Sequence, residues 1–398
     1  MVNTTLINLT TALVDGTNST LLNASSSKFG FLHTLANPAL LMVALPVLLV
    51  AVIMIFVIRN VMPVSHFLYA NSRIQARSNY MVNNSLLLNL AEAKSLKEFL
   101  SLLRETDYGE ELEKSKYDLR SFHSALEKGF INSLLELVEL SPKNSQPLFD
   151  AYLMFLESKI LKIVHRARFM GVKIDGGLVY AIGGVDENLL KRLLETETIA
   201  DVNVVMKPTT YAEVFEKEHP NLEEFEVEMD KFVFNNFVDV VKKTKMHDGK
   251  YIIDMLNKRM DILNISALIK FRIRGVEKDR QGKMLIDNGT DLAKRFDKLI
   301  NAESMKDFVE VFQGLDYYEP MSQALEDYDK NGAMAHFETE SYRYFKKYII
   351  SNELSHTLGP YPLFSNLIKK ELELRNMFII SRGIEAGFSV EKIKRMVI

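Results

Sequence analysis

The chain has 398 residues, of which 47% are hydrophobic and 25% are charged, so it is long and apolar enough to fold into two or three domains. Its formal net charge of −3 argues against a nucleic-acid-binding protein, which normally presents a strongly basic face. The sequence contains no cysteine, which excludes disulfides, thiol nucleophiles and cysteine-ligated zinc. With only 10 prolines and 18 glycines, it is predicted to be mostly helical.

The first 37 residues form a tail that is rich in Asn, Thr and Ser. This tail contains four N-x-S/T sequons, at Asn3, Asn8, Asn18 and Asn23. The sequons would accept glycans if the tail lay outside the cytoplasm. Chance occurrence in a tail of this composition explains them equally well.

An uncharged segment, PALLMVALPVLLVAVIMIFVI, follows at 38–58. As a helix it would be about 32 Å long, enough to cross a hydrocarbon core of roughly 30 Å. Only Lys28 precedes it as a base, whereas several bases follow closely, namely Arg59, Arg73, Arg77, Lys94 and Lys97. This asymmetry predicts a single-pass protein of the cell membrane, with a transmembrane helix at 38–62 and the rest of the chain in the cytoplasm. A buried core helix is the alternative.

Three segments of the remaining chain resemble one another: SLKEFLSLLRETDY (95–108), TIADVNVVMKPTTY (198–211) and SMKDFVEVFQGLDY (304–317). Each begins with Ser or Thr, has an acid three positions later and ends with tyrosine. The first two features form a capping box, so each segment is predicted to begin a helix. The tyrosines are predicted to pack at equivalent joints between helices and to form hydrogen bonds through their hydroxyls. They are Tyr108, Tyr211 and Tyr317.

A second set of similar segments is ESKILKIVHRARFMG (157–171), DILNISALIKFRIRG (261–275) and ELRNMFIISRGIEAG (373–387). Each is predicted to be one long helix, with its acid near the N-terminus, bases in the last turns and glycine at the C-cap. Together the repeats predict three similar helical units of about 105 residues, which stack and form a concave surface. We place them at 63–147, 148–252 and 253–398. The predicted fold is therefore all-α, with one N-terminal transmembrane helix.

The sequence lacks the motifs of common catalytic and cofactor sites. It contains no G-x-x-x-x-G-K-[ST] phosphate-binding loop, and its glycine clusters lack the dinucleotide-binding spacing. Glu353 and His356 resemble one half of a carboxylate di-iron site, but the pair does not recur. We therefore predict no catalytic residue, no cofactor and no metal. The charged stretches at 242–250 and 277–283 are predicted to be solvated turns, with contact loops as the alternative.

From Tyr69 onward the chain resembles the C subunits of archaeal (A-type) ATP synthases, which are homologues of the d subunits of V-type ATPases. The resemblance rests on YANSRIQARSNYMV (69–82), GPYPLF (359–364), Gly383 and SVEKIKRMVI (389–398). It also rests on the run KELELRN, which contains Glu371, Glu373, Arg375 and Asn376. The family is built from three similar helical domains that form a funnel. The residues of this run are expected to have a structural role as readily as a partner contact.

The resemblance implies a rotor component that is not an enzyme. It would couple the central stalk, made of the D and F subunits, to the membrane ring of proteolipid subunits, and so link proton or sodium transport to ATP synthesis or hydrolysis in the A/B head. No small-molecule substrate is implied. Residues 1–68 are interpreted as an addition to the usual family member, and we hypothesise that their helix lies in the lumen of the ring.

Two bases on the first helix after the membrane segment are candidates for contact with the ring or with lipid headgroups. These bases, Arg73 and Arg77, are four residues apart and therefore share a helix face. A solvated basic face is the alternative. The alternative function for the whole chain is a single-pass membrane scaffold whose helical repeats bind another partner.

Overall fold

The computed structural model describes residues 38–77, 81–115, 118–174 and 179–398. These residues form helices joined by turns, with one isolated bridge between Ile182 and Val185 and no strand among them. The all-α prediction is therefore confirmed for the described chain. The N-terminal tail with its four sequons lies outside the described residues.

The chain divides into two compact units, residues 1–63 and 64–398. The described part of the first unit is α3 (Pro38–Phe56), followed by a π-helical turn (Val57–Val61) and α4 (Met62–Ser65), which crosses the boundary. The stretch Met42–Arg59 is long and apolar enough to cross a membrane, and none of it is buried. This exposure argues against the alternative of a buried core helix.

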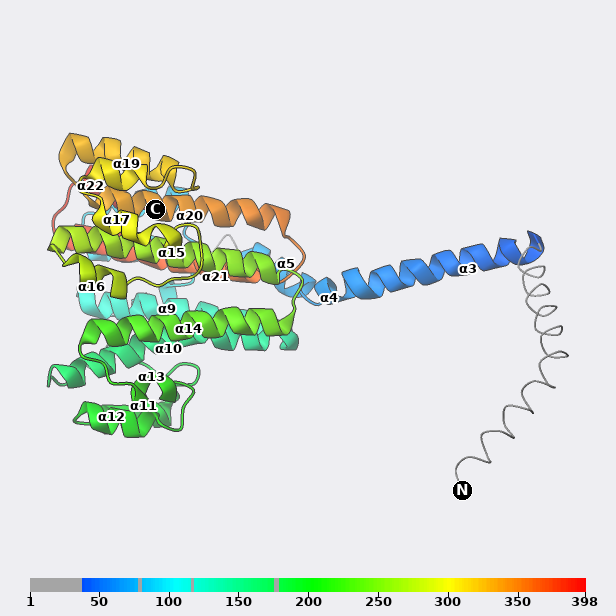
Figure 1. Cartoon of the computed structure of the whole chain (residues 1–398), viewed down its shortest axis with the longest axis horizontal. Coiled ribbons are helices and arrows are strands. Elements are labelled where there is room, and N and C mark those ends of the chain that lie inside the picture. Colours follow the sequence, from blue (N-terminus) through cyan, green and yellow to red (C-terminus); the bar gives the residue numbers. More distant parts are fainter. Residues whose placement is uncertain (1–37, 78–80, 116–117, 175–178) are drawn as a thin grey trace, which may run out of the picture. The chain divides into compact units, whose positions relative to one another are not determined.

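The second unit is a body of long helices surrounded by short ones (Figure 1). Its first part contains α5 (Leu68–Arg77), α6 (Asn84–Glu92), α7 (Leu96–Leu103), α8 (Gly109–Glu113), α9 (Leu119–Leu140), a 3-10 turn (Lys143–Ser145) and α10 (Gln146–Phe169). Its middle part contains α11 (Glu187–Glu195), α12 (Ile199–Met206), α13 (Ala212–Glu216), α14 (Leu222–Thr244), α15 (Gly249–Arg274) and α16 (Lys278–Lys283). A 3-10 turn (Ala293–Arg295) follows, then α17 (Phe296–Asn301), α18 (Met305–Glu310), α19 (Tyr318–Asn331), α20 (Ala335–Ser355), α21 (Tyr361–Glu385) and α22 (Val390–Met396).

The repeated Ser/Thr segments begin helices as predicted. In each copy the side-chain oxygen of the N-cap residue accepts a hydrogen bond from the backbone N–H three residues later, at Ser95, Thr198 and Ser304. In the second and third copies the acid returns the bond to the N-cap N–H, which completes the capping box. The first copy differs, because Glu98 accepts from the N–H of Lys94 at 2.8 Å.

The long helices α10, α15 and α21 each end close to the predicted glycine, which is the C-cap residue of α15 and directly follows the C-cap residue of α10 and of α21. Gly171, Gly275 and Gly387 adopt φ values of +63°, +62° and +66°, a region that favours glycine. The residue after each glycine donates its N–H to the carbonyl five residues earlier, which closes the last helical turn.

The predicted position of the acids near the N-termini of these helices is wrong. The three helices begin at Gln146, Gly249 and Tyr361, so the acids at 157, 261 and 373 lie in their middle and are buried. An acid in the first turn contributes only about 0.3–1 kcal/mol through the helix dipole. Apolar residues upstream extend the helices further, because each helix buries these residues in the core.

The three long helices run in the same direction. Phe149 of α10 stacks on Phe364 of α21 with ring centroids 5.1 Å apart. Further along both helices, Phe155 of α10 lies under the guanidinium of Arg259, which pairs with Glu371 of α21. The start of α15 also meets the start of α21, because Asp248 lies against Gly359. Equivalent positions of the three helices therefore lie at similar depths in the body.

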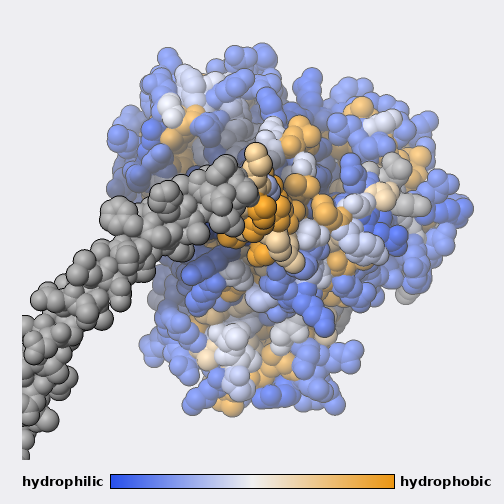
Figure 2. Space-filling model, turned by 90° about the vertical axis from the view of Figure 1, so that its right-hand side faces the viewer, coloured by the Kyte–Doolittle hydropathy of each residue, from blue (hydrophilic) through white to orange (hydrophobic). Residues whose placement is uncertain are grey.

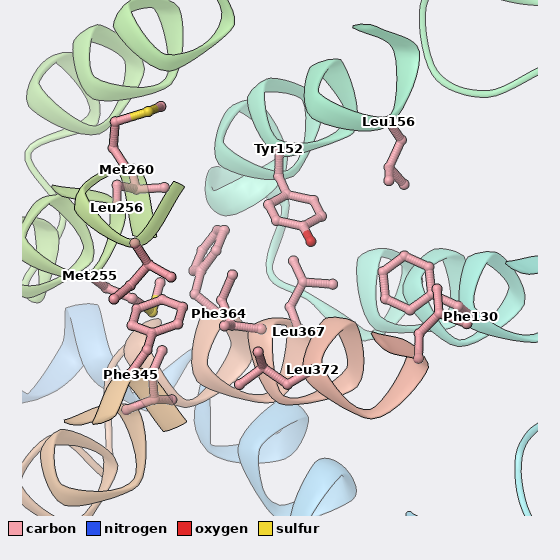
Figure 3. Close-up of a cluster of buried hydrophobic side chains, with 14 of the residues drawn as sticks. Phe130, Tyr152, Leu156, Met255, Leu256, Met260, Phe345, Phe364, Leu367 and Leu372 are labelled. Atoms are coloured by element: carbon pink, nitrogen blue, oxygen red, sulfur yellow. The ribbon is translucent and has the colours of Figure 1, made fainter. Parts of the chain in front are cut away.

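Apolar side chains from α9, α10, α15, α20 and α21 meet in the core between these helices (Figure 3). α21 is the most enclosed of them, since 16 of its 25 residues are buried on several sides. It packs against α9, α15 and α20. A helix that is buried nearly all round fixes the positions of its neighbours, which makes the body stiff.

Candidate partner-binding site

The repeated tyrosines bind the repeated acids. The hydroxyl of Tyr211 donates to Oε2 of Glu157 at 2.7 Å, and that of Tyr317 donates to Oδ2 of Asp261 at 2.9 Å. Burial raises the pKa of both carboxyls, and the hydrogen bond from the tyrosine opposes this increase in each case. Each pair ties a short outer helix to a long inner one.

Tyr108 lies beside the third acid, Glu373. Burial, and then the negative charge of Glu373, raise the pKa of Tyr108 well above its usual value. The hydroxyl lies outside hydrogen-bonding geometry, so this pair is a contact without a formed bond. In the other two pairs the acid precedes its tyrosine by 54 and 56 residues, whereas Glu373 follows Tyr108 by 265 residues. α21 therefore supplies the acid that the first tyrosine requires.

A second set of equivalent positions faces inward, two residues before each acid. These positions hold Phe155, Arg259 and Glu371. Nη2 of Arg259 lies 3.0 Å from Oε1 of Glu371, and its guanidinium carbon lies 4.5 Å from the ring centroid of Phe155. Nη1 of Arg259 is buried and has no hydrogen-bond partner among the described residues.

Arg259 and Glu371 of this set line a cavity of about 730 Å³ beside the C-terminal halves of α15 and α21. Its lining carries five bases, Lys159, Arg259, Lys270, Arg375 and Arg382, against two acids, Glu338 and Glu371. Arg375 and Lys270 both pair with Glu338, at 2.8 Å and 3.4 Å. The rest of the lining is largely apolar and includes Ile262, Leu263, Phe378 and Phe388.

The cavity therefore suits a protein segment that presents acidic and apolar side chains together. Sequence reasoning missed Lys159, Arg259, Lys270 and Arg382 as members of one surface. The signal was present in part, because Lys270 and Arg382 occupy equivalent positions near the ends of the repeated segments.

The family run KELELRN is engaged within the chain. Glu371 and Arg375 form the pairs described above, and Arg375 also lies 4.0 Å over the ring of Tyr342. Asn376 exchanges two hydrogen bonds with the backbone of Ile398, at 2.8 Å and 2.9 Å. These residues therefore have partners within the chain, and their contact with another subunit stays a prediction.

The two candidate bases on α5 differ in their surroundings. Arg77 pairs with Asp107 at 3.4 Å and with Glu136. Arg73 is exposed. Of the two, Arg73 is therefore the better placed to meet another molecule.

Glu353 and His356 have separate partners. Glu353 binds Ser365 and Lys369, both at 2.7 Å. His356 lies against the ring of Tyr251, with centroids 3.7 Å apart. Among the described residues there is no group of three His, Asp or Glu side chains that could hold a metal ion.

The sequence matches the family described as "ATP synthase (C/AC39) subunit" over residues 70–396. Among curated proteins it is similar to the C subunit of the A-type ATP synthase of Methanocaldococcus jannaschii, with 24% identity over 91% of this chain and 94% of the relative. It is also similar to the same subunit of Pyrococcus furiosus, with 25% identity over 83% of this chain and 89% of the relative. The same subunit of Methanosphaera stadtmanae is 25% identical over 94% of this chain and 98% of the relative.

The fraction of this chain that these alignments cover corrects the interpretation of residues 1–68 as an addition to the usual family member. Residues 69–398 are 330 of the 398 residues, or 83% of the chain. The alignment with the M. stadtmanae protein covers 94% of the chain and must therefore include part of the first 68 residues. Some relatives thus have a counterpart to at least part of this region.

Proposed function

The chain belongs to the ATP synthase (C/AC39) subunit family, and on that premise we propose that it couples the central stalk, made of the D and F subunits, to the proteolipid ring. As a component of an A-type ATP synthase it is part of a membrane-associated complex and is not catalytic. The proton or sodium flow through the ring would then be linked to ATP synthesis or hydrolysis in the A/B head.

The observation that carries this proposal is the basic cavity beside the C-terminal halves of α15 and α21. It would receive the end of the stalk, with Lys159 and Arg382 at its exposed rim and Arg259 at its floor. Charges at a rim mainly steer association and fix its register, whereas the half-buried Arg259 would bind an acid of the stalk directly.

The architecture of the body suits the transmission of torque. We propose three similar units along the predicted boundaries, arranged as a funnel, with α21 completing the first unit through Glu373. The tyrosine–carboxylate contacts hold short outer helices on the long inner ones in each unit. A closely packed helical body of this kind passes on a twist with little elastic deformation.

We test this function by purifying the tagged full-length chain from its native membranes in mild detergent and quantifying the proteins that accompany it. The expected result is recovery of the A/B head, the D and F subunits and the proteolipid ring, with one copy of this chain for every three A subunits. Recovery of the chain alone, or with unrelated membrane proteins, would contradict the coupling role and favour a membrane scaffold.

A charge-reversal variant tests the cavity within the same experiment. The double variant Lys159→Glu/Arg382→Glu is expected to lower recovery of the D and F subunits by about tenfold while the ring is retained, because like charges would then face the stalk. The matched control is Lys191→Glu/Arg192→Glu on α11, which makes the same change in net charge at exposed positions outside the cavity. Equal recovery from both variants would rule out the cavity as the stalk site.

We also propose that α3 spans the membrane once and that the second unit lies on its cytoplasmic face. Arg59 and Arg73 follow the apolar stretch, and an excess of bases after a span marks the cytoplasmic side. The tail with its four sequons would then lie on the other side. In the assembled complex the helix would lie in the lumen of the rotor ring and rotate with it.

Deleting residues 1–60 is expected to reduce retention of the chain on membranes washed with high salt by about tenfold or more, because an apolar span resists salt whereas charged contacts are screened. Immunoblotting of the washed membranes measures this retention. The control is deletion of residues 1–37, which removes the tail but keeps α3 and should leave retention unchanged. Equal retention of both deletions would mean that α3 does not anchor the chain.

A further inference from the structure

Two asparagines bind equivalent stretches of backbone. Asn264 exchanges two hydrogen bonds with the backbone of Ile286, at 2.8 Å and 3.0 Å. Asn376 does the same with Ile398, at 2.9 Å and 2.8 Å. Both asparagines stand fourth in a repeated segment, and each isoleucine follows its asparagine by 22 residues. The stretch that ends at Ile398 therefore takes the place beside α21 that the stretch before Ile286 takes beside α15.

The two stretches differ in what lies next to them. Ile286 continues along the chain into the turn that leads to α17. The neighbour of Ile398 is instead α6, which belongs to the beginning of the second unit and starts at Asn84. Lys346 of α20 joins them, because its Nζ donates to the carbonyl oxygen of Ile398 at 3.0 Å and to Oδ1 of Asn84 at 3.4 Å. A connection that is covalent in one place is thus a side-chain bridge in the other.

Residues 388–398, which include α22, form a segment that we call the strap. It packs against α6, α20 and α21. Nη2 of Arg343 on α20 donates to the carbonyl oxygens of Arg395 and Val397, at 3.0 Å and 2.8 Å. Three apolar side chains of the strap are buried: Ile393, Val397 and Ile398. A segment that buries few side chains can open at a smaller free-energy cost than the body on which it lies.

The strap forms part of the wall of the cavity proposed above to receive the stalk. Phe388 and Met396 of the strap line this cavity together with Arg382 of α21. Gly383 allows the strap to lie close to α21, because an added Cβ there would be 2.8 Å from Cγ1 of Ile393. Release of the strap would therefore remove one wall of the cavity, while the bases that α10, α15 and α21 contribute would remain.

We propose that the strap is a detachable closure that controls the stalk site. With the strap closed, Phe388 and Met396 complete the cavity and the stalk binds. With the strap released, this wall is lost and the stalk dissociates. The apparent affinity for the stalk then falls in proportion to the fraction of molecules in which the strap is closed. The inference rests on the function proposed above for the cavity.

The strap is remote from the end of the second unit where α5 begins. Figure 1 shows α22 at the opposite end of the body. Figure 2 views the molecule from the α5 end, where apolar residues lie among predominantly hydrophilic ones. Release of the strap is therefore expected to leave the surface at the α5 end unchanged.

Hydrogen exchange of the full-length chain in detergent, measured by mass spectrometry on overlapping peptides, tests whether the strap detaches. Ile286 and Ile398 form a matched pair, because both are 7% exposed and both donate their N–H to the Oδ1 of an asparagine. The protection factor of the Ile398 amide is expected to be at least about tenfold lower. Equal protection of the two amides would show that the strap is a fixed part of the body and would overturn the inference.

The two asparagines provide matched variants for the same measurement. Asn376→Ala is expected to lower protection of the strap by about tenfold and to change protection of α15 little. Asn264→Ala removes the equivalent bonds from a stretch that is continuous with its neighbours, so it should lower protection of α15 and α17 together. An Asn376→Ala variant that loses protection throughout the second unit would contradict a strap that detaches by itself.

Removing and returning the strap tests its control of the stalk. Deletion of residues 388–398 is expected to lower recovery of the D and F subunits by about tenfold in the purification described above, with the ring retained. A synthetic peptide of residues 388–398, added in excess, should restore recovery to within about twofold. The control peptide carries Ile393→Asp and should not restore it, because this side chain is buried against α21. A loss that the unchanged peptide does not reverse would overturn the detachable strap.

The charge-reversal variant Lys159→Glu/Arg382→Glu separates this inference from the function on which it rests. If this variant loses D and F while the deletion of residues 388–398 keeps them, the stalk site stands and its control by the strap is wrong. If neither loses them, the stalk site itself is wrong and the inference fails with it.

Discussion

Replacing Lys370 with methionine is expected to lower the free energy of unfolding by about 3–5 kcal/mol, the usual result of removing one partner from a buried ionic group. Lys370 is only 5% exposed. Its Nζ lies 2.7 Å from Oδ2 of Asp107 and 3.2 Å from Oε2 of Glu373. The substitution would leave the buried carboxylate of Glu373 without this base and Asp107 with Arg77 as its remaining basic partner.

The loss should depend on pH. Burial already raises the pKa of Glu373, and Lys370 is the main group that opposes this increase. Without Lys370 the folded-state pKa would lie further above the unfolded value. A carboxyl whose pKa is higher in the folded state favours folding while it is protonated. The free energy of unfolding therefore falls as the pH rises from the unfolded-state pKa through the folded-state pKa. The deficit of Lys370→Met should therefore shrink between pH 7 and pH 5.

Urea unfolding of the detergent-solubilised chain, followed by circular dichroism, measures both effects. The matched control is Lys369→Met, because Lys369 is a neighbouring lysine that is partly exposed and pairs with Glu353 at 2.7 Å. A partly exposed ion pair of that kind contributes about 0–1 kcal/mol to the free energy of unfolding. A deficit for Lys370→Met no larger than that of the control would show that the buried cluster does not hold α21 in place.

Replacing Gly183 with alanine is expected to destabilise the protein by about 2–5 kcal/mol, as the sum of backbone strain and a lost buried contact. Gly183 has φ +55°, and an added Cβ would lie 2.0 Å from Oε1 of Glu157. The carboxylate would have to move away from both of its donors, the hydroxyl of Tyr211 and the N–H of Gly184.

Gly171→Ala separates these two contributions. Gly171 has a similar φ of +63°, but an added Cβ would meet nothing within 4 Å. Its alanine variant should lose only the backbone part, about 1–2 kcal/mol. Thermal unfolding of the two variants beside the unchanged chain gives the difference. Equal losses would mean that the contact between Glu157 and Tyr211 adds nothing to stability.

The sequence predicted the features that depend on neighbouring residues. N-caps such as Thr198 and terminal glycines such as Gly275 act within one helical turn, so their spacing alone specifies them. It did not predict that the repeated acids bind the repeated tyrosines. That pairing joins residues at least 54 positions apart, and no local rule relates them. The sequence placed Asp261 at a helix start because the dipole rule was the only local rule available for an acid followed by apolar residues.

The repeats predicted a concave surface, since stacked helical units produce one, and that surface stays a prediction. The basic cavity was not predicted, because Arg259 and Arg375 come from different helices and both line it only through the packing of α15 against α21. The pairing of Glu371 with Arg259 was likewise hidden, although Glu371 had been identified through the family run.

The contact between Tyr108 and Glu373 also affects the order in which the protein can fold. A ribosome releases α7 and α8 long before it has synthesised α21, so Tyr108 waits for more than 250 further residues before Glu373 is made. Contacts of such large sequence separation slow folding and leave apolar surface exposed on the nascent chain. The hydrogen bond between Tyr211 and Glu157, which are 54 residues apart, can form while translation continues. We therefore expect assembly to begin from the centre of the chain, with its two ends joining last.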